Sequence, residues 1–343
     1  MNRPHVHGRP ARYDRRTALR FGALGALGAA GGLAALSTAG CAATAGGPTD
    51  RVTIASGYGI SYAPLTVIQE RKWLEEALPD RTVNWTVLSG GSASRDAMLS
   101  GEVQFGTSGL GPFLISRDAG IPWKVVSGLN DMPLWLVATE ERLQSLEDFG
   151  SDDKIAAVQP GSIQSVMLQR AAQEELGDPH ALDDNIVSMD HPSALQALLS
   201  GQIAGQYTSP PFQFQAVEQG ARKLVDSYDL FGRHGFNVVT ATEEYAEAQP
   251  EVLEAFHEAI ARANELITDD PSQVADILSR ADDDQTSPEE YERYLTWEGI
   301  EYTTTPHSLV EVGSFMASID VIETEPTDWR ALVFDTVADE DGS

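Results

Sequence analysis

Small hydroxyl-bearing and glycine residues follow several predicted strands of this chain, at the points where helices begin. The candidate ligand contacts are Ser61, Tyr62, Gly90, Gly91, Ser92, Thr107, Ser108, Gly161, Ser162, Gln164, Tyr207 and Ser209. At the carboxyl ends of parallel strands, helix N-termini offer unpaired N–H groups to a polar or anionic solute. Tyr62 and Tyr207 are candidate aromatic walls. Because Ser, Thr and Gly also cap helices generally, the set predicts a binding site better than any single member does.

Signals for catalysis are weak. The chain has no Gly-x-Ser-x-Gly elbow, no Gly-x-Gly-x-x-Gly and no phosphate-binding Gly-x-x-x-x-Gly-Lys-Ser/Thr motif. The histidines after residue 40 lack metal-ligand spacing, and we expect each to lie at the surface or to be hydrogen-bonded internally. They are His180, His191, His234, His257 and His307. We therefore expect no metal, no cofactor and no enzymatic reaction.

Two stretches about a hundred residues apart are alike. Residues 96–108 read DAMLSGEVQFGTS, and residues 195–209 read LQALLSGQIAGQYTS. Each predicts a helix that ends at a glycine, a short strand, and then a Thr-Ser pair that opens the next helix. The shared Leu-Ser-Gly and Thr-Ser at nearly constant offset indicate a structural duplication.

The surrounding sequence fits two α/β units of this kind. The expected strands are 51–56, 82–88 and 103–105 in the first unit, and 154–158, 186–189 and 203–207 in the second. The expected helices include 63–78, 243–248, 250–268, 272–279, 288–298 and 306–319, and we expect those after residue 241 to cover the first lobe. Apolar strands at 134–139 and 236–240 are predicted to connect the lobes. Alternation of strands and helices predicts two lobes, each a mainly parallel sheet flanked by helices.

The amino-terminal segment predicts export and lipid attachment. Arg15-Arg16 precede an apolar, Gly/Ala-rich run that ends in Ser37-Thr38-Ala39-Gly40-Cys41. This order resembles a twin-arginine signal followed by a lipoprotein cleavage box, with the lipid on Cys41. An ordinary secretory signal and a membrane-spanning helix are the alternatives, but the run is short and glycine-rich for about 30 Å of hydrocarbon. We expect a chain tethered outside the cytoplasmic membrane.

Charge narrows the range of partners. The net charge of the 343 residues is −29, and residues 1–40 hold six Arg and one Asp, which leaves −34 on the other 303 residues. This acidic balance argues against nucleic acid and against an anionic bilayer surface as partners, because both need clustered Lys and Arg. With a single cysteine, no disulfide framework can form within the chain.

The chain resembles substrate-binding lipoproteins of ABC importers, in the nitrate/sulfonate/taurine group that includes thiamine-precursor binders. The likeness covers about residues 52–268. It rests on Tyr-Ala-Pro-Leu at 62–65, Gly-Gly-Ser at 90–92, Leu-Ser-Gly-Glu-Val-Gln-Phe-Gly at 99–106 and Gln-Pro-Gly-Ser at 159–162. Where the family often has Asp-Ala before the pocket, this chain has Gly205-Gln206.

The resemblance implies a type II periplasmic-binding-protein-like fold that closes on one solute, through two crossover strands that act as a hinge. The expected organisation is a signal at 1–40, a tether at 41–50, lobe 1 at 51–135 and 241–343, and lobe 2 at 136–240. The expected partners are a small solute, either an oxyanion or a flat heterocycle, and the transmembrane subunit of an ABC permease, with the chain itself a monomer. The alternatives are a sensing module for a membrane receptor and a pyrimidine-synthesising enzyme on the same fold.

Overall fold

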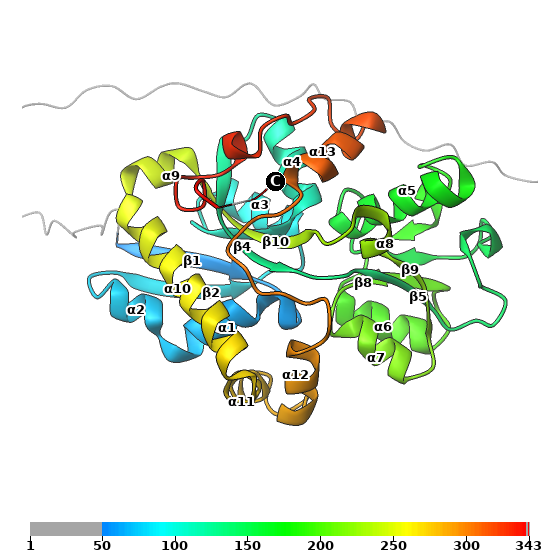
Figure 1. Ribbon diagram of the computed structural model, residues 1–343, viewed down its shortest axis with the longest axis horizontal. Coiled ribbons are helices and arrows are strands. Elements are labelled where there is room, and N and C mark those ends of the chain that lie inside the picture. Colours follow the sequence, from blue (N-terminus) through cyan, green and yellow to red (C-terminus); the bar gives the residue numbers. More distant parts are fainter. Residues whose placement is uncertain (1–49, 341, 343) are drawn as a thin grey trace, which may run out of the picture. The chain divides into compact units, whose positions relative to one another are not determined.

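The computed structural model describes residues 50–340 and 342. Cys41 and the predicted signal and tether lie outside the described residues. Two mixed sheets organise the described chain into two lobes, which Figure 1 shows in mostly blue, cyan and yellow for lobe 1 and mostly green for lobe 2. Within the described part, no helix is long and apolar enough to cross a membrane.

The sheet of lobe 1 has the strand order β2-β1-β3-β10-β4. A parallel bridge between Ile54 and Phe105 joins the β1-β2 pair to the segment that leads into β3. The strands are β1 (Arg51–Ser56), β2 (Thr82–Val87), β3 (Gly106–Gly109), β4 (Trp123–Asp131) and β10 (Gly235–Thr242).

The sheet of lobe 2 has the corresponding order β7-β6-β8-β5-β9. The strands are β5 (Trp135–Ala138), β6 (Ile155–Ala156), β7 (Ile186–Val187), β8 (Gly205–Thr208) and β9 (Arg222–Asp226). If β1, β2, β3 and β4 are matched with β6, β7, β8 and β9, the two sheets have one topology. The duplication inferred from the repeat is therefore confirmed.

The chain crosses between the lobes twice, and the strands that follow these crossings, β5 and β10, are antiparallel to their neighbours. β10 is antiparallel to both β3 and β4, and β5 is antiparallel to both β8 and β9. The remaining strands of each lobe are consequently parallel to one another, as expected. The chain passes between the lobes at residues 132–134 and 232–234, just before β5 and β10. Each strand is assigned to the lobe whose sheet it joins, so that β10 belongs to lobe 1 and β5 to lobe 2. The exact lobe limits at 135/136 and 240/241 remain predictions.

Helices flank both sheets. They are α1 (Ala63–Arg71), α2 (Trp73–Ala77), α3 (Gly91–Leu99), α4 (Leu110–Asp118), α5 (Ile163–Leu176), α6 (His191–Leu199), α7 (Phe212–Glu218), α8 (Ser227–Phe231), α9 (Glu243–Ala248), α10 (Pro250–Asp269), α11 (Pro271–Ala281), α12 (Pro288–Leu295) and α13 (Leu309–Ser318). Single 3-10 turns lie at Ile60–Tyr62, Leu146–Asp148, Asp183–Asn185 and Trp329–Leu332.

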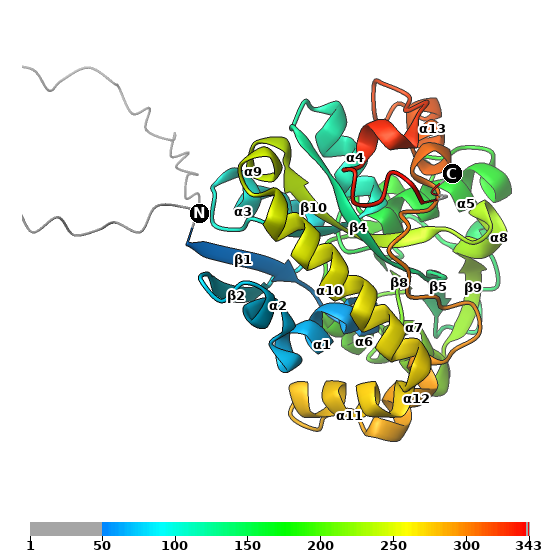
Figure 2. The ribbon, with the colours of Figure 1, turned by 60° about the vertical axis from the view of Figure 1, so that its left-hand side comes forward.

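The helices after residue 241 mostly cover lobe 1, as expected. The 20-residue α10 packs on α1, α2 and β4, and Figure 2 shows it running along these elements. α13 packs on α4. α12 also contacts lobe 2, because Tyr294 donates a hydrogen bond of 3.0 Å to Glu218 of α7.

Three local predictions are corrected. The single helix expected at 63–78 breaks at Lys72, whose left-handed backbone (φ 57°) ends α1. Thr107 and Ser108 do not open a helix, because they pair with β10 as part of β3, and α4 begins only at Leu110. Thr208 likewise ends β8, and α7 begins at Phe212. In both lobes pairing with β10 or β5 places the strand later than the side-chain patterns suggest, at 106–109 instead of 103–105 and at 205–208 instead of 203–207.

Candidate functional site

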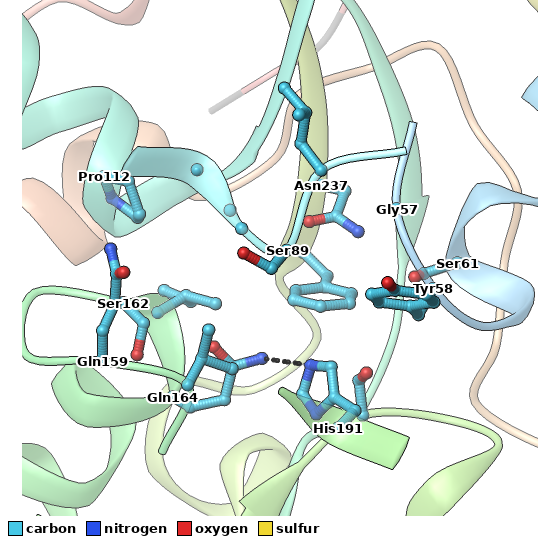
Figure 3. A pocket seen from close by; sticks show the side chains of 18 of the residues that line it. Gly57, Tyr58, Ser61, Ser89, Pro112, Gln159, Ser162, Gln164, His191 and Asn237 are labelled. Atoms are coloured by element: carbon cyan, nitrogen blue, oxygen red, sulfur yellow. Dashed lines mark hydrogen bonds between the residues drawn. The ribbon is translucent and has the colours of Figure 1, made fainter. Parts of the chain in front are cut away.

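A pocket lies between the strand ends of the two lobes. Its wall includes the loop after β1 and the start of α3 from lobe 1, and the loop after β6 and the start of α6 from lobe 2 (Figure 3). The enclosed space is about 40 Å³. A single water needs about 10–15 Å³ on this measure, so the space suits a compact solute.

Seven of the twelve residues expected at the site line this pocket. They are Ser61, Tyr62, Gly90, Gly91, Ser162, Gln164 and Ser209. They come from both lobes and from strand ends or helix starts, as the parallel-sheet argument requires. Gln164, Ser162 and Ser209 are each at least 96% buried.

The other five expected residues lie outside the lining. Thr107 and Ser108 are held in β3, where the Thr107 backbone N–H donates to Ser94 Oγ at 2.9 Å. Tyr207 is fully buried within β8, opposite Leu136 of β5. Its side chain packs in the core of lobe 2, which strand alternation alone does not reveal.

Ser92 and Gly161 instead lie where the lobes touch each other. Ser92 Oγ accepts a hydrogen bond from Gln159 Nε2 of lobe 2. A Cβ on Gly111, at the start of α4, would lie 3.2 Å from the Gly161 carbonyl oxygen. The lobes therefore approach closely around the pocket.

A second contact between lobes needs a specific glycine. A Cβ on Gly59 would lie 3.0 Å from the Pro210 carbonyl oxygen and 3.1 Å from the Phe212 ring, both in lobe 2. Gly59 also has φ +90°, a conformation that other residues rarely adopt. The loop of lobe 1 that carries Tyr58 and Ser61 thus rests on lobe 2.

His191 lines the pocket, although sequence reasoning treated it as an ordinary histidine. Its Nδ1 lies 2.8 Å from Thr208 Oγ1, its Nε2 lies 3.5 Å from Gln164 Nε2, and its ring stacks on Phe212 with centroids 5.4 Å apart. With the Gln164 amide donating to Nε2, Nδ1 carries the proton and donates to Thr208. The internal repeat could have indicated His191 as a lining residue, because His191 begins α6 in lobe 2 as Gly91 begins α3 in lobe 1.

Asn237 is the other important residue that the sequence did not indicate. It lies in β10, opposite Gly109, and lines the pocket from the crossing strand. Tyr58, Ser89 and Gln159 also line the wall, and Figure 3 labels them together with Asn237. Nothing in the local pattern of β10 marks Asn237 as a residue that lines the pocket.

The pocket is electrically neutral. Its lining, taken over the described residues, includes no Asp, Glu, Lys or Arg. Burial lowers the pKa of His191 to about 4 and raises the pKa of Tyr62 to about 12, so both side chains are uncharged at pH 7. Nor do residues 50–340 gather three or more His, Cys, Asp or Glu into a possible metal site. The arrangement can bind and enclose a small solute by hydrogen bonds.

Three polar atoms of the lining have no hydrogen-bond partner. They are Ser61 Oγ, Ser209 Oγ and Asn237 Nδ2, and their residues are at most 2% exposed. Buried polar atoms are nearly always paired in folded proteins. Three such atoms lie in the wall of this pocket, and others lie elsewhere in the described chain, as at Asn264 of α10.

Comparison with known proteins gives a consistent result. The model of the NMT1-like family matches residues 45–280, more than half of the chain. A taurine-binding periplasmic protein of Escherichia coli (strain K12) is 26% identical over 211 residues, which is 60% of this chain and 63% of that protein. The chain thus spans less than two thirds of that relative's length.

Two further proteins are similar. A putative aliphatic sulfonates-binding protein of Bacillus subtilis (strain 168) is 26% identical over 252 residues, 70% of this chain and 74% of that protein. The structure of the alkanesulfonate-binding protein SsuA from Xanthomonas axonopodis pv. citri, bound to MOPS, matches with a TM-score of 0.65 at 19% identity, over 81% of this chain and 95% of that one. This likeness confirms the expected two-lobed, type II periplasmic-binding-protein-like fold.

Proposed function

This chain belongs to the NMT1-like family, and from that membership we propose that it is the extracytoplasmic solute-binding component of an ABC importer. In this proposal the two lobes capture a small anionic or heteroaromatic solute, and the closed form delivers it to a membrane permease. The observation that carries the proposal is the neutral, donor-rich pocket built from the strand ends of both lobes. The binding functions in the names of the E. coli and B. subtilis relatives support it.

The mechanism follows from where the lining residues are attached. Ser61 and Asn237 belong to lobe 1, whereas Ser209 and Gln164 belong to lobe 2. A solute that contacts both sets binds the closed arrangement better than an open one, and this difference in affinity drives closure. The segments 132–134 and 232–234 are the hinge in this proposal, because the strands pass between the lobes there.

The residues that line the pocket fit binding of a solute without a chemical reaction. His191 is neutral and already hydrogen-bonded, and no lysine lines the wall within the described residues. The binding proteins among the relatives favour transport over an enzymatic role.

We also propose that the chain is anchored by a lipid on Cys41 after twin-arginine export. This part rests on the order of Arg15-Arg16, the apolar run and Cys41. Metabolic labelling with a palmitate analogue tests it: the wild type should incorporate label and sediment with membranes, and Cys41→Ser should do neither. Label on the variant, or a wild type that stays in the soluble fraction unlabelled, would contradict lipid attachment.

Thermal unfolding with a solute panel tests binding. The panel contains nitrate, alkanesulfonates, taurine, aminopyrimidines and aromatic acids, and the protein is the chain from Cys41 onward with that cysteine replaced by serine. A bound solute raises the melting temperature because it binds only the folded form. Mass spectrometry of co-purified small molecules extends the search. No shift and no co-purified ligand, or turnover of any panel member, would overturn the proposed function.

A further inference from the structure

Three buried polar side chains hold the backbone where the chain crosses between the lobes. They are Gln213 of α7 and Ser227 of α8, both in lobe 2, and His234 of the second crossing, just before β10. Polar groups are rarely buried unless they form hydrogen bonds. None of the three lines the pocket between the strand ends, so solute binding does not account for them.

Gln213 and Ser227 hold the first crossing on lobe 2. Gln213 Nε2 donates to the Pro133 carbonyl oxygen at 3.0 Å, and Gln213 Oε1 accepts from the Trp135 N–H at 3.3 Å. The Leu134 N–H donates to Ser227 Oγ at 2.8 Å, and the Ser227 N–H donates to the Leu134 carbonyl oxygen at 2.9 Å. Lobe 2 therefore holds this crossing from the Pro133 carbonyl onward.

The Ser227 hydroxyl also holds the second crossing. His234 Nε2 lies 2.7 Å from Ser227 Oγ, and His234 Nδ1 lies 2.9 Å from the Gly235 carbonyl oxygen. A carbonyl oxygen only accepts, so Nδ1 carries the proton and Nε2 of the neutral ring accepts from the hydroxyl. Burial lowers the pKa of His234, so the ring is neutral at pH 7, although the bond to Gly235 and two nearby carboxylates act in the opposite direction. One buried hydroxyl thus joins both crossings.

Lobe 1 holds the crossings from the other side. Asp131, the last residue of β4, pairs with Gly235, the first residue of β10, and its backbone exchanges hydrogen bonds with Glu301. The stretch between the contacts of the two lobes is therefore short. It consists of Met132 in the first crossing and of the link between His234 and Gly235 in the second.

An ion pair also spans this boundary, between Arg233 and Glu301. Both side chains are about half exposed, and exposed pairs contribute little to stability. Tyr228 and Phe231 of α8, in contrast, pack edge to face on the His234 ring, with centroids 5.2 and 6.3 Å away. The second crossing is therefore held mainly by lobe 2 up to His234.

We propose that Ser227 and His234 are positioning residues of the hinge. The lobes turn about Met132 in the first crossing and about the His234–Gly235 link in the second. The inference rests on the closure in the proposed function and narrows its hinge to these positions. Because one hydroxyl joins both crossings, the two bend together and lobe 2 turns about a single axis. Without that hydroxyl the crossings move separately, and the lobes take up a wider range of separations.

The tautomer of His234 tests the hydrogen bond itself. The protein is the chain from residue 41 onward with Cys41→Ser, which contains no cysteine. NMR of the ring nitrogens at pH 8, assigned by comparison with His234→Gln, should show the proton on Nδ1 and a bare Nε2. A ring protonated at Nε2 would overturn the proposal, because Nε2 could not then accept from Ser227.

Distances between the lobes test the positioning role. Glu102→Cys and Gln202→Cys place spin labels on the exposed turns after α3 and α6, one in each lobe. Pulsed electron resonance of the solute-free protein should show a wider distribution of distances with Ser227→Ala than without it. Ser116→Ala is the control, because Ser116 is also buried and its hydroxyl bonds the Pro112 carbonyl oxygen within α4. An unchanged width in Ser227→Ala, or the same widening in Ser116→Ala, would overturn the proposal.

Two substitutions at His234 separate positioning from packing. Gln retains an oxygen that can accept from the Ser227 hydroxyl, whereas Leu fills similar space without an acceptor. His234→Gln should keep the wild-type distribution of distances, and His234→Leu should widen it as Ser227→Ala does. Equal widths in the two variants would show that the ring only fills space, and would remove His234 from the proposal. If either variant does not fold, the tautomer and the Ser227→Ala comparison still decide.

The Leu134 amide provides a measure within the first crossing. It loses its acceptor in Ser227→Ala, so its hydrogen exchange should be about 2- to 13-fold faster, the factor that corresponds to a typical hydrogen bond. Exchange at the wild-type rate would show that the hydroxyl does not hold this crossing, and would overturn the proposal.

The spin labels also separate this inference from the proposed function. A wild-type distance that changes with a bound solute, together with an unchanged distribution in Ser227→Ala, would overturn the hinge assignment and support the function. A wild-type distance that no member of the solute panel changes would count against the function. The solute-free variants would then still decide the hinge assignment.

Discussion

Asp131 and His307 form a hydrogen bond of 2.9 Å where the first crossing leaves lobe 1. Asp131 is the last residue of β4 and is fully buried, and its backbone exchanges hydrogen bonds of 2.8 and 3.0 Å with Glu301. Gly235, the first residue of β10, is so near that a Cβ there would lie 2.8 Å from the His307 carbonyl oxygen. The C-terminal segment that carries Glu301 and His307 thus packs against the chain at both crossings between the lobes, next to Asp131 and Gly235.

This pair should make stability depend on pH. The hydrogen bond to Asp131 raises the pKa of His307 above its usual 6.5, and the charges of Glu301 and Glu340 act in the same direction. A raised pKa means that the stabilisation is complete below the unfolded-state pKa and is lost as pH rises through the folded-state pKa. His307→Asn should therefore lower the melting temperature more at pH 5.5 than at pH 9.

The matched control for this prediction is His180→Asn. His180 also has a raised pKa, caused by Asp183, but both side chains are more than 40% exposed. Exposed pairs contribute little to stability, so this variant should change the melting temperature only slightly at either pH. A His307→Asn effect that grows with pH would contradict the assignment.

Gly90 and Gly91 should tolerate alanine differently. A Cβ on Gly91 would lie 2.7 Å from Pro112 Cβ and 2.8 Å from Ser108 Cβ, both within lobe 1. Gly91→Ala should therefore cost about 1–3 kcal/mol of unfolding free energy, measured by urea denaturation. A Cβ on Gly90 would meet only Val158 of lobe 2, at 3.3 Å. Gly90→Ala should weaken solute affinity by hindering closure while stability stays near that of the wild type. A loss of stability in Gly90→Ala together with weaker solute binding only in Gly91→Ala would contradict these contacts.

The hydrogen bond from Gln159 to Ser92 should favour the closed arrangement. A typical hydrogen bond contributes about 0.5–1.5 kcal/mol, so Ser92→Ala should raise the dissociation constant of the bound solute about 2- to 13-fold. Small-angle scattering should also show a larger solute-free molecule. Ser100→Ala is the control, because Ser100 Oγ bonds only the Ala97 carbonyl oxygen of the same lobe. Equal affinities for both variants would exclude a role of this bond in closure.

Ionic strength should distinguish an anionic solute from a neutral one. The net charge of −34 on residues 41–343 repels an approaching anion, and the screening length falls from about 30 Å at 0.01 M to about 10 Å at 0.1 M salt. The association rate of an anionic solute should thus rise, by roughly 2- to 5-fold, over this range. Stopped-flow tryptophan fluorescence can measure it. A rate that falls with salt would indicate a positive local field at the entrance.

The architecture could be predicted from the sequence because the same order of helix, glycine and strand occurs once in each lobe. The Leu-Ser-Gly and Thr-Ser positions at 99–108 and 199–209 placed equivalent helices and strands, and both sheets have the corresponding strand order. The exact strand limits were missed at Thr107 and Thr208. Pairing with β10 or β5 decides those limits, and such long-range pairing leaves no local pattern.

The pocket lining was predicted only where it follows the rule for parallel strands. Ser61, Gly90 and Ser162 lie at strand ends or helix starts, and they line the pocket. Asn237 lies within a crossing strand, so the rule does not apply to it. His191 does follow the rule, but its residue type alone favours an ordinary role, and its stacking on Phe212 is a tertiary contact that leaves no local pattern.

β10 lies between β3 and β4 in the first sheet, and β5 lies between β8 and β9 in the second. The order in which the two sheets can be completed therefore follows the order of synthesis. β3 and β4 are joined only through β10, and β8 and β9 only through β5, among the ladders of the described chain. A nascent chain that ends before Gly235 can assemble the second sheet but leaves the first one divided. Lobe 1 is therefore the last part of the molecule to become complete although it contains the first strand, and a fragment that ends before Gly235 cannot complete its sheet.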